Sequence, residues 1–317
     1  MYSRIASNIR KSWALIIAFI LLVAAIGWFF GQLTGFGFWG LGIAVGISLL
    51  MTWGSYFSSD KIAIKMSRAV PADPNQFREL HNVVEELSIA AGLPKPKVYV
   101  MNDSAPNAFA TGRNPEHGAI AVTTGLLERM NRDELQGVIA HELAHVKNRD
   151  TLVSTLAVTL VGVIVLLGDW MLRAMWFGGG NRDRGGGLGA PIAIIGIVFM
   201  ILSPIIAQLM QLAISRRREY LADIDGAFLT RHPQGLIDAL QKLKDDPTVV
   251  RTASRATAHL WIESPIARVK SEGRGAWLNR LFNTHPPLED RIKILQEEAV
   301  GGELHNRLAT MPPPTSA

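Results

Sequence analysis

The amino-acid sequence predicts a mainly α-helical, multi-pass membrane protein that carries a small β-sheet in its polar segments. Three observations lead to this fold class. The chain of 317 residues is 48% hydrophobic and 19% charged, below the roughly 25% charged residues of soluble domains. It contains four long apolar runs. The polar segments between these runs alternate between helix-like and strand-like patterns.

The first two apolar runs predict an N-terminal transmembrane hairpin over residues 1–57, with spans near 13–30 and 36–57. The run from Trp13 to Phe30 has 18 residues, which at 1.5 Å per residue cross most of a hydrocarbon core of about 30 Å. A cleaved signal peptide is the alternative for this run, because basic residues precede it. The hairpin is favoured, since a second apolar run follows at once and no convincing small-residue cleavage site lies between them.

Two later apolar runs predict a second hairpin over residues 151–214, with spans near 151–172 and 191–214. A Gly-rich loop separates these two runs. A buried core helix or a re-entrant hairpin is the alternative for either run, and the sequence leaves it open.

The basic residues predict the orientation in the membrane. Lys and Arg cluster before the first and third spans and after the second and fourth, and an even number of crossings places all four clusters on one side. The polar segments 58–150 and 215–306 should therefore face the cytoplasm. This topology also explains the net charge of +5 without a nucleic-acid partner. The tail, 307–317, is expected to be disordered.

Within the polar segments, apolar residues at helical spacing predict a helix from Phe77 that ends at Gly92. "KVYVM" and "GAIAVT" read as strands, and "NAFATG" between them as a loop or bulge. "NRDE", beginning at Asn131, resembles a capping box and opens a helix that runs to about Asn148.

That last helix carries "HELAH", in which His141 and His145 are four residues apart. Residues i and i+4 lie on the same helical face, so both imidazoles can bind one metal ion. Glu142 lies between them and can reach a metal-bound water. The pattern H-E-x-x-H indicates a zinc site in which the glutamate acts as general base.

A catalytic zinc usually has a third protein ligand. The chain has no cysteine, so this ligand must be His, Glu or Asp, and thiol catalysis and disulfides are excluded. Glu219 is well suited, and Asp223, four residues on, can accept the second ring N–H of a zinc-bound histidine. The alternative, in which Glu219 only pairs with nearby arginines, remains open at this point.

Several motifs resemble the HtpX family of membrane-bound zinc metalloproteases, relatives of the CAAX prenyl endopeptidases. They are "HELAHVKNRD", "SRRREYLADIDGA" and "NTHPPLEDRI", in this order with a hairpin between the first two, together with "APNAFATG" and "HLWIESPIARV". The resemblance implies a cytoplasmic, zincin-like catalytic domain of the gluzincin type. It also implies one Zn²⁺ per chain, bound by His141, His145 and Glu219, with Glu142 as catalytic base.

The gluzincin-type fold implied by the resemblance has an edge strand beside the active helix, to which an extended substrate adds by β-augmentation. Either residues 118–123 or the stretch Asn107, Ala108, Phe109 and Ala110 can supply this strand. His285 is the candidate for stabilising the oxyanion, with Arg291 supporting it; the alternative is a histidine that caps the turn before two prolines.

The family resemblance implies an endopeptidase of the inner or plasma membrane. Its expected partners are the lipid bilayer and polypeptide substrates, in particular misfolded membrane proteins cleaved during quality control and heat stress. Two alternatives remain: a CAAX-type processing peptidase, whose relatives usually have more spans, and a non-catalytic metal-binding membrane protein. Against the latter, the four spans contain almost no ionisable residues that would mark a transport pathway.

Overall fold

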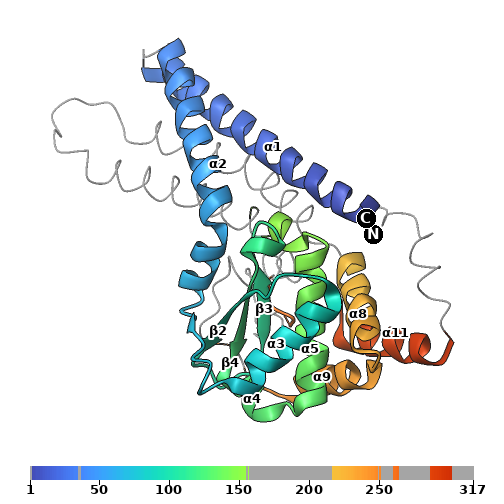
Figure 1. Cartoon of the computed structure of the whole chain (residues 1–317). Coiled ribbons are helices and arrows are strands. Elements are labelled where there is room, and N and C mark those ends of the chain that lie inside the picture. Colours follow the sequence, from blue (N-terminus) through green and yellow to red (C-terminus); the bar gives the residue numbers. More distant parts are fainter. Residues whose placement is uncertain are drawn as a thin grey trace.

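A computed structural model describes residues 2–34, 37–154, 156, 216–248, 250, 260–263 and 286–301 (Figure 1). Nearly all of the second predicted hairpin, 151–214, lies outside these ranges, as do His285 and the tail 307–317. The mainly helical fold with a small mixed sheet agrees with the class that the sequence predicts.

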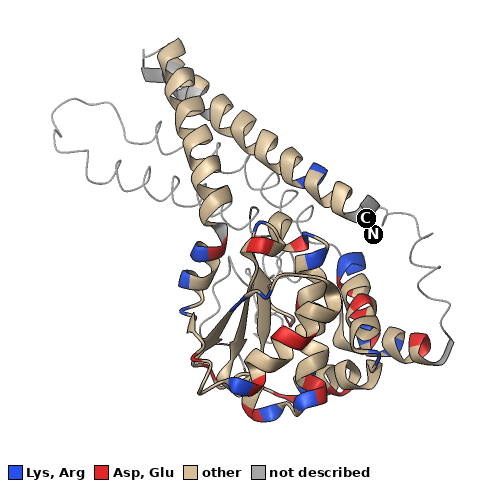
Figure 2. Cartoon of the chain, in the orientation of Figure 1, with Lys and Arg blue, Asp and Glu red and all other residues tan. Residues whose placement is uncertain are grey.

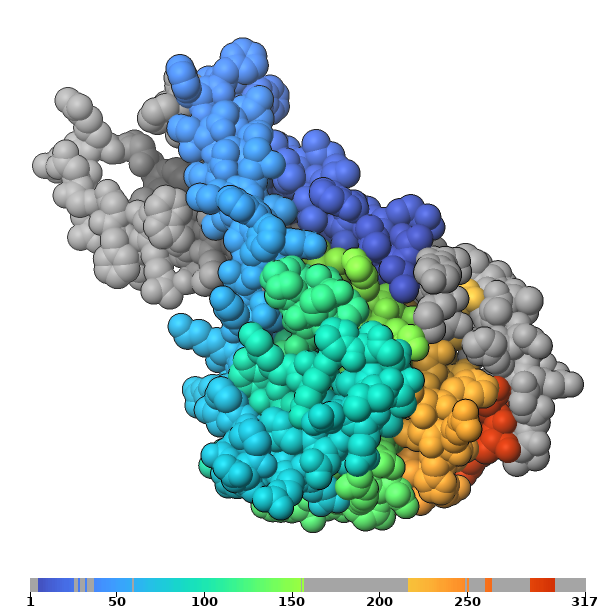
Figure 3. Space-filling view, in the orientation of Figure 1, coloured from blue at the N-terminus to red at the C-terminus, as the bar shows by residue number. Residues whose placement is uncertain are grey.

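Two long helices, α1 (Tyr2–Thr34) and α2 (Phe38–Met66), form a hairpin that projects from the rest of the molecule (Figures 1 and 3). Among the described helices, these two contain stretches long and apolar enough to span a membrane, Ile5–Ala25 and Phe38–Ser58. The first stretch begins earlier than the predicted start at Trp13. Charged residues gather on the body and where the two helices meet it, and the far half of the hairpin has none (Figure 2).

The sheet has four strands in the order β1-β2-β4-β3. β1 (Val70–Pro71) is antiparallel to β2 (Lys97–Met101), β2 is parallel to β4 (Ala119–Thr123), and β4 is antiparallel to β3 (Ala108–Thr111). The prediction of a loop or bulge at "NAFATG" is wrong, because this segment forms β3. All four residues of β3 are buried, so its sequence shows none of the polar–apolar alternation that identifies a strand with one solvated face.

Both faces of the sheet are covered. One face packs on helices α3 (Arg78–Ala91) and α5 (Arg132–Lys147), and the shared core cluster includes Val100, Ile120 and Val138. The other face packs on Ile64 of α2 and on Trp261. The helix α2 therefore continues from its long apolar stretch into the body and becomes part of its core.

The remaining described helices complete the body around α5. They are the 3₁₀ turn η1 (Pro115–His117), α4 (Thr124–Arg129), α8 (Arg216–Thr230), α9 (Pro233–Asp245) and α11 (Leu288–Gly301). α8 and α9 both pack directly on α5. The central helix is thus enclosed by elements from both halves of the sequence, and this enclosure creates the candidate site.

Candidate metal centre

The helix that carries the HELAH motif is fixed at its start by a complete capping box. Asn131 accepts a hydrogen bond from the Glu134 backbone N–H at 3.0 Å, and Glu134 accepts one from the Asn131 N–H at 2.8 Å. These bonds satisfy two of the N–H groups that a helix start leaves without partners. The capping box predicted from the sequence is confirmed, and it defines where α5 begins.

α8 approaches α5 closely because Gly226 faces it. A Cβ atom at this position would lie 2.9 Å from the backbone nitrogen of His141. The absence of a side chain therefore lets the two helices pack nearly backbone to backbone. Glu219 lies on the same helix as Gly226, about two turns earlier, so this contact brings its carboxylate toward the two imidazoles.

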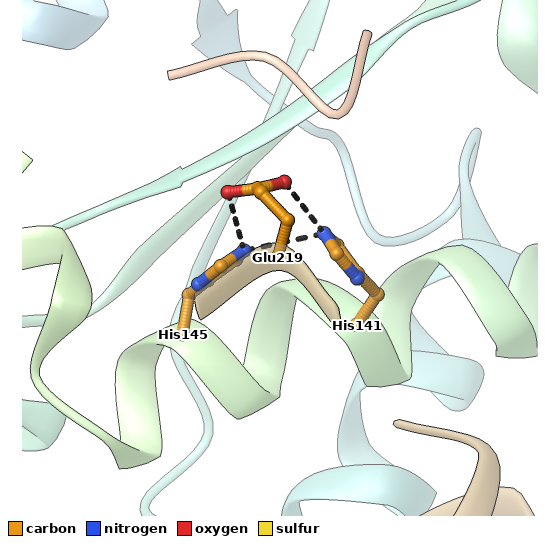
Figure 4. Close-up of side chains that lie close together, drawn as sticks. All are labelled: His141, His145 and Glu219. Carbon is orange, nitrogen blue, oxygen red and sulfur yellow. Dashed lines mark hydrogen bonds and ion pairs between the residues drawn. The ribbon is translucent and has the colours of Figure 1, made fainter. Parts of the chain in front are cut away.

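His141, His145 and Glu219 converge on one point (Figure 4). Their possible ligand atoms all lie within 4.8 Å of one another. The two Nε2 atoms are 3.2 Å apart, and the Glu219 oxygens lie 3.9 Å from His141 Nε2 and 3.7 Å from His145 Nε2. Ligands about 2.0–2.1 Å from a tetrahedral zinc are about 3.3 Å apart, so these separations suit one small divalent ion.

Each imidazole is oriented from behind by a carboxylate. Asp223 Oδ1 lies 2.8 Å from His141 Nδ1, and Asp150 Oδ2 lies 3.1 Å from His145 Nδ1. A carboxylate accepts hydrogen bonds, so both Nδ1 atoms carry a ring proton and both Nε2 atoms point toward the shared position. The two Nε2 atoms face each other at 3.2 Å, so a cation has to lie between them: a proton on His145 when no metal is present, or a metal ion bound by both imidazoles. This donor set therefore fits a metal ion.

Asp223 is itself held by Arg291, and both side chains are fully buried. Arg291 Nε donates to Asp223 Oδ2 at 2.8 Å and Nη2 donates to Oδ1 at 2.6 Å, a bidentate pair. Arg291 Nη1 also donates to the Ile262 carbonyl at 2.7 Å. Burial opposes ionisation of Asp223, but Arg291 outweighs it and lowers the pKa of the carboxyl.

The charges of the site differ from residue to residue. Burial lowers the pKa of His141 to about 4, so its imidazole is neutral, as a metal ligand must be. Burial raises the pKa of Glu142 to about 7, in the range suited to a general base. Burial also opposes the charged form of His145, but Asp150 and Glu219 outweigh it and raise its pKa to about 9.

Glu142 lies within this cluster with one oxygen unsatisfied. Among the described residues, its Oε1 is buried and has no hydrogen-bond partner, while the carboxylate accepts a hydrogen bond from the Ala110 backbone. The residue lines a small cavity of about 30 Å³ together with both histidines and Glu219. A buried carboxylate oxygen without a partner is costly, and a water molecule in this cavity would satisfy it.

The outer edge of β3 is partly covered by the chain itself. Phe109 forms an antiparallel bridge with Trp261, and the Ile262 N–H donates to the Ala108 carbonyl at 2.9 Å. Asn107 donates through Nδ2 to the Glu263 carbonyl at 2.9 Å. β3 is the edge strand next to α5, whereas residues 118–123 belong to the interior strand β4. A substrate that pairs with Ala108 and Phe109 has to displace residues 260–263.

Comparison with known proteins now identifies the family. The sequence profile of peptidase family M48 matches residues 74–299. The chain belongs to peptidase family M48. It is 48% identical over 299 residues to a protease HtpX homolog of Caldanaerobacter subterraneus subsp. tengcongensis, covering 93% of this chain and 97% of that protein.

A second relative agrees with this assignment. A protease HtpX homolog of Streptococcus gordonii is 41% identical over 302 residues, covering 94% of this chain and 99% of its own. Among solved structures, the crystal structure of S. mikatae Ste24p has a TM-score of 0.48 and 18% identity, and the match covers 93% of this chain and 67% of that one. As an M48 member with two helices suited to span a bilayer, the protein is a membrane metalloprotease.

Within this M48 chain, the structure brings together most of the residues that the sequence singled out. His141, Glu142, His145, Glu219 and Asp223 lie in one cluster. Arg291 contacts Asp223, whereas the sequence suggested that it would support His285, which lies outside the described residues. Asn107 is 2% exposed, and its side chain is hydrogen-bonded to the Glu263 carbonyl.

Sequence reasoning missed Asp150 and Trp261, which also line the site. Asp150 follows His145 by five residues in "HVKNRD", so it stood within the motif. Its contact with His145 depends on a turn at Arg149, whose φ of 57° no local pattern indicates.

Proposed function

We propose that this protein is a multi-pass membrane endopeptidase that uses one zinc ion to cleave membrane proteins or their cytoplasmic segments. The observation that carries the proposal is the convergence of His141, His145 and Glu219 beside the unsatisfied oxygen of Glu142. Two histidines, a carboxylate and a neighbouring glutamate base form the ligand set of catalytic zinc in peptidases.

His141, His145 and Glu219 would hold the zinc. When bound, zinc acidifies a water molecule and polarises the scissile carbonyl. Glu142 takes a proton from the attacking water through its unsatisfied Oε1 and then delivers it to the leaving amine. Asp223 and Asp150 keep the imidazoles in the required tautomer throughout. His285 remains our candidate for stabilising the oxyanion, and Asn107–Ala110 for contacting the substrate backbone.

The topology we propose has residues 1–57 and 151–214 as two hairpins, with segments 58–150 and 215–306 forming one catalytic domain in the cytoplasm. The charge distribution supports it, since Lys and Arg flank the two described spans where they meet the body (Figure 2). A site so close to the bilayer favours substrates that are themselves in the membrane, including misfolded membrane proteins during quality control.

The test of the mechanism is Glu142→Gln in the full-length protein, purified in mild detergent and assayed on an unfolded casein. Because glutamine cannot accept the proton, cleavage should fall by about 10²–10⁴-fold, whereas zinc content should stay at one ion per chain. Glu85→Gln, at an exposed position on α3, is the matched control and should cleave normally. Near wild-type cleavage by Glu142→Gln would refute the role of Glu142 as the base. Purified wild-type protein without bound zinc would refute the proposed cofactor.

The orientation has a separate test, which the absence of native cysteine makes simple. Phe38→Cys lies at the start of α2, at the tip of the hairpin, and Phe38 is 79% exposed; Ile89→Cys lies on α3, and Ile89 is 74% exposed. In intact cells, a membrane-impermeant maleimide should label Phe38→Cys, and it should label Ile89→Cys only after permeabilisation. The opposite labelling pattern would place the catalytic body outside the cytoplasm.

A further inference from the structure

The end of the metal-binding helix turns back on itself. α5 ends at Lys147, and Arg149 adopts a positive φ of 57°, a conformation that costs energy in a residue with a side chain. The turn brings Asp150 back onto the helix it follows, where its Oδ2 lies 3.1 Å from His145 Nδ1. Asp150 is 6% exposed, so the orientation of His145 depends on how this buried carboxylate is held.

The second oxygen of that carboxylate is held by the first membrane helix. Asn8 Nδ2 donates to Asp150 Oδ1 at 2.7 Å and to the Asn148 carbonyl at 2.8 Å. A side-chain amide has two N–H groups, so both are used on the turn that follows α5. Arg218 Nε also lies near Oδ1, at 3.7 Å.

Asn8 is an unusual residue for its position. It is 4% exposed and lies within the stretch Ile5–Ala25 that is apolar enough to span a bilayer. A buried amide in such a helix is costly unless its hydrogen bonds are satisfied, and polar residues there usually have a function. A purely structural role, docking α1 onto the body, would be served by any buried partner. The partner here is the carboxylate that orients a metal ligand.

We propose that Asn8 is a positioning residue of the metal centre, which acts through Asp150 to fix the orientation of His145. The chain of contacts runs from the α1 amide to the carboxylate and from the carboxylate to the imidazole, all between buried or nearly buried atoms. This inference rests on the proposed role of His145 as a zinc ligand. It makes the first membrane helix part of the catalytic site, so that zinc affinity depends on how α1 packs against the end of α5.

The test measures metal binding in the full-length protein in mild detergent. Zn²⁺ affinity is measured by competition with a chromophoric chelator, and the ligand field by the visible spectrum of the Co²⁺-substituted protein. Loss of a direct partner of a metal ligand typically weakens binding by about 10–100-fold, and we expect this of Asp150→Ala. Asn8→Ala, one contact further away, should weaken Zn²⁺ binding by roughly 3–10-fold and shift the Co²⁺ spectrum.

A double-mutant cycle separates positioning from a general structural role. If Asn8 acts through Asp150, Asn8→Ala should cause no further loss of Zn²⁺ affinity in a protein that already carries Asp150→Ala. Asn8→Leu fills the space of the asparagine without its donors, so it should weaken binding as Asn8→Ala does. Ser12→Ala, on the same helix and 4% exposed with its hydroxyl bonded to the Asn8 carbonyl, should bind Zn²⁺ normally.

Three results would overturn the inference. The first is wild-type Zn²⁺ affinity and a wild-type Co²⁺ spectrum in both Asn8→Ala and Asn8→Leu. The second is an equal loss of Zn²⁺ affinity from Asn8→Ala whether or not Asp150→Ala is present, and the third is a loss of Zn²⁺ affinity in Asn8→Ala but not in Asn8→Leu. The last result would indicate a cavity and not a hydrogen bond. Failure of the wild-type protein to bind one Zn²⁺ per chain would instead refute the proposed function.

Discussion

The two histidines of the site lie on adjacent turns of one helix, yet they are held by different parts of the molecule. His141 is 0% exposed, and its carboxylate partner, Asp223, is locked by the buried guanidinium of Arg291. The His145 side chain is 14% exposed, and its partner, Asp150, is held by the neutral amide of Asn8 in α1. The inner half of the site thus lies within the body, and the outer half lies where the body meets the hairpin of α1 and α2.

The two orienting carboxylates are therefore stabilised in different ways. In the inner half, a buried ion pair compensates the charge of Asp223 at the cost of desolvating two groups, which makes the arrangement rigid and intolerant of any single loss. In the outer half, the Asp150 carboxylate is hydrogen-bonded to Asn8 and His145 and lies 3.7 Å from Arg218. Several partners therefore share in stabilising its negative charge. We therefore expect variants of the inner half to affect stability most, and variants of the outer half to affect mainly metal binding.

The largest expected effect on folding comes from Arg291→Met. It leaves the buried carboxylate of Asp223 without its counter-ion, which should lower the free energy of unfolding by about 3–5 kcal/mol. Thermal unfolding in mild detergent, followed by tryptophan fluorescence, measures the change. The matched variant in the outer half, Asp150→Asn, should unfold close to the wild-type temperature while binding Zn²⁺ more weakly.

The double variant Arg291→Met with Asp223→Leu sharpens this prediction. It removes both charges, so much of the lost stability should return, but His141 loses its orienting carboxylate and Zn²⁺ affinity should stay low. If Arg291→Met unfolds at the same temperature as Asp150→Asn, the contrast between the two halves is wrong.

A smaller effect is expected from Gly226→Ala, which tests the close approach of α8 to α5. The added Cβ would lie 2.9 Å from His141 N and 3.1 Å from its Cα, so the helices must separate. Such overpacking typically costs about 1–3 kcal/mol, and separation also moves Glu219 away from the imidazoles. The expected result is a lower unfolding temperature together with weaker Zn²⁺ binding.

Gly235→Ala is the control for this variant. Its Cβ would lie 2.4 Å from the Asp133 carbonyl, at the start of α5 and away from the metal-binding residues. It should lower the unfolding temperature to a similar extent but leave Zn²⁺ affinity unchanged. Equal Zn²⁺ affinity in the two variants would mean that the α8 contact does not set the position of Glu219.

Residues related by helical periodicity could be predicted from the sequence. His141 with His145, and Glu219 with Asp223, are each four residues apart on a single helix, and this spacing alone places each pair on one face. The structure brings both pairs into one cluster, although their roles as ligands and partners stay predictions. The capping box was predictable for the same reason, because its two residues lie within one turn.

Contacts that depend on tertiary packing could not be predicted. Asn8 and Asp150 are separated by 142 positions, and only the docking of α1 brings them together. The residue pattern alone did not indicate β3, because burial on both faces removes the alternation of a typical strand; only the family resemblance offered this stretch as an edge strand. Trp261 belongs to a segment of four described residues, and no local pattern indicates that it pairs with the edge of β3.

The smallest expected effect comes from Asn131→Ala, at the opposite end of α5 from Asn8. Both asparagines use their side-chain amides to fix an end of the same helix, but Asn131 is ten residues from His141, about 15 Å along the axis. Loss of the cap should lower the free energy of unfolding by about 1 kcal/mol and leave Zn²⁺ affinity unchanged, as chelator competition would show. A parallel loss of Zn²⁺ affinity would mean that α5 responds as one rigid unit, so that neither half of the site is held independently and the separation drawn between them fails.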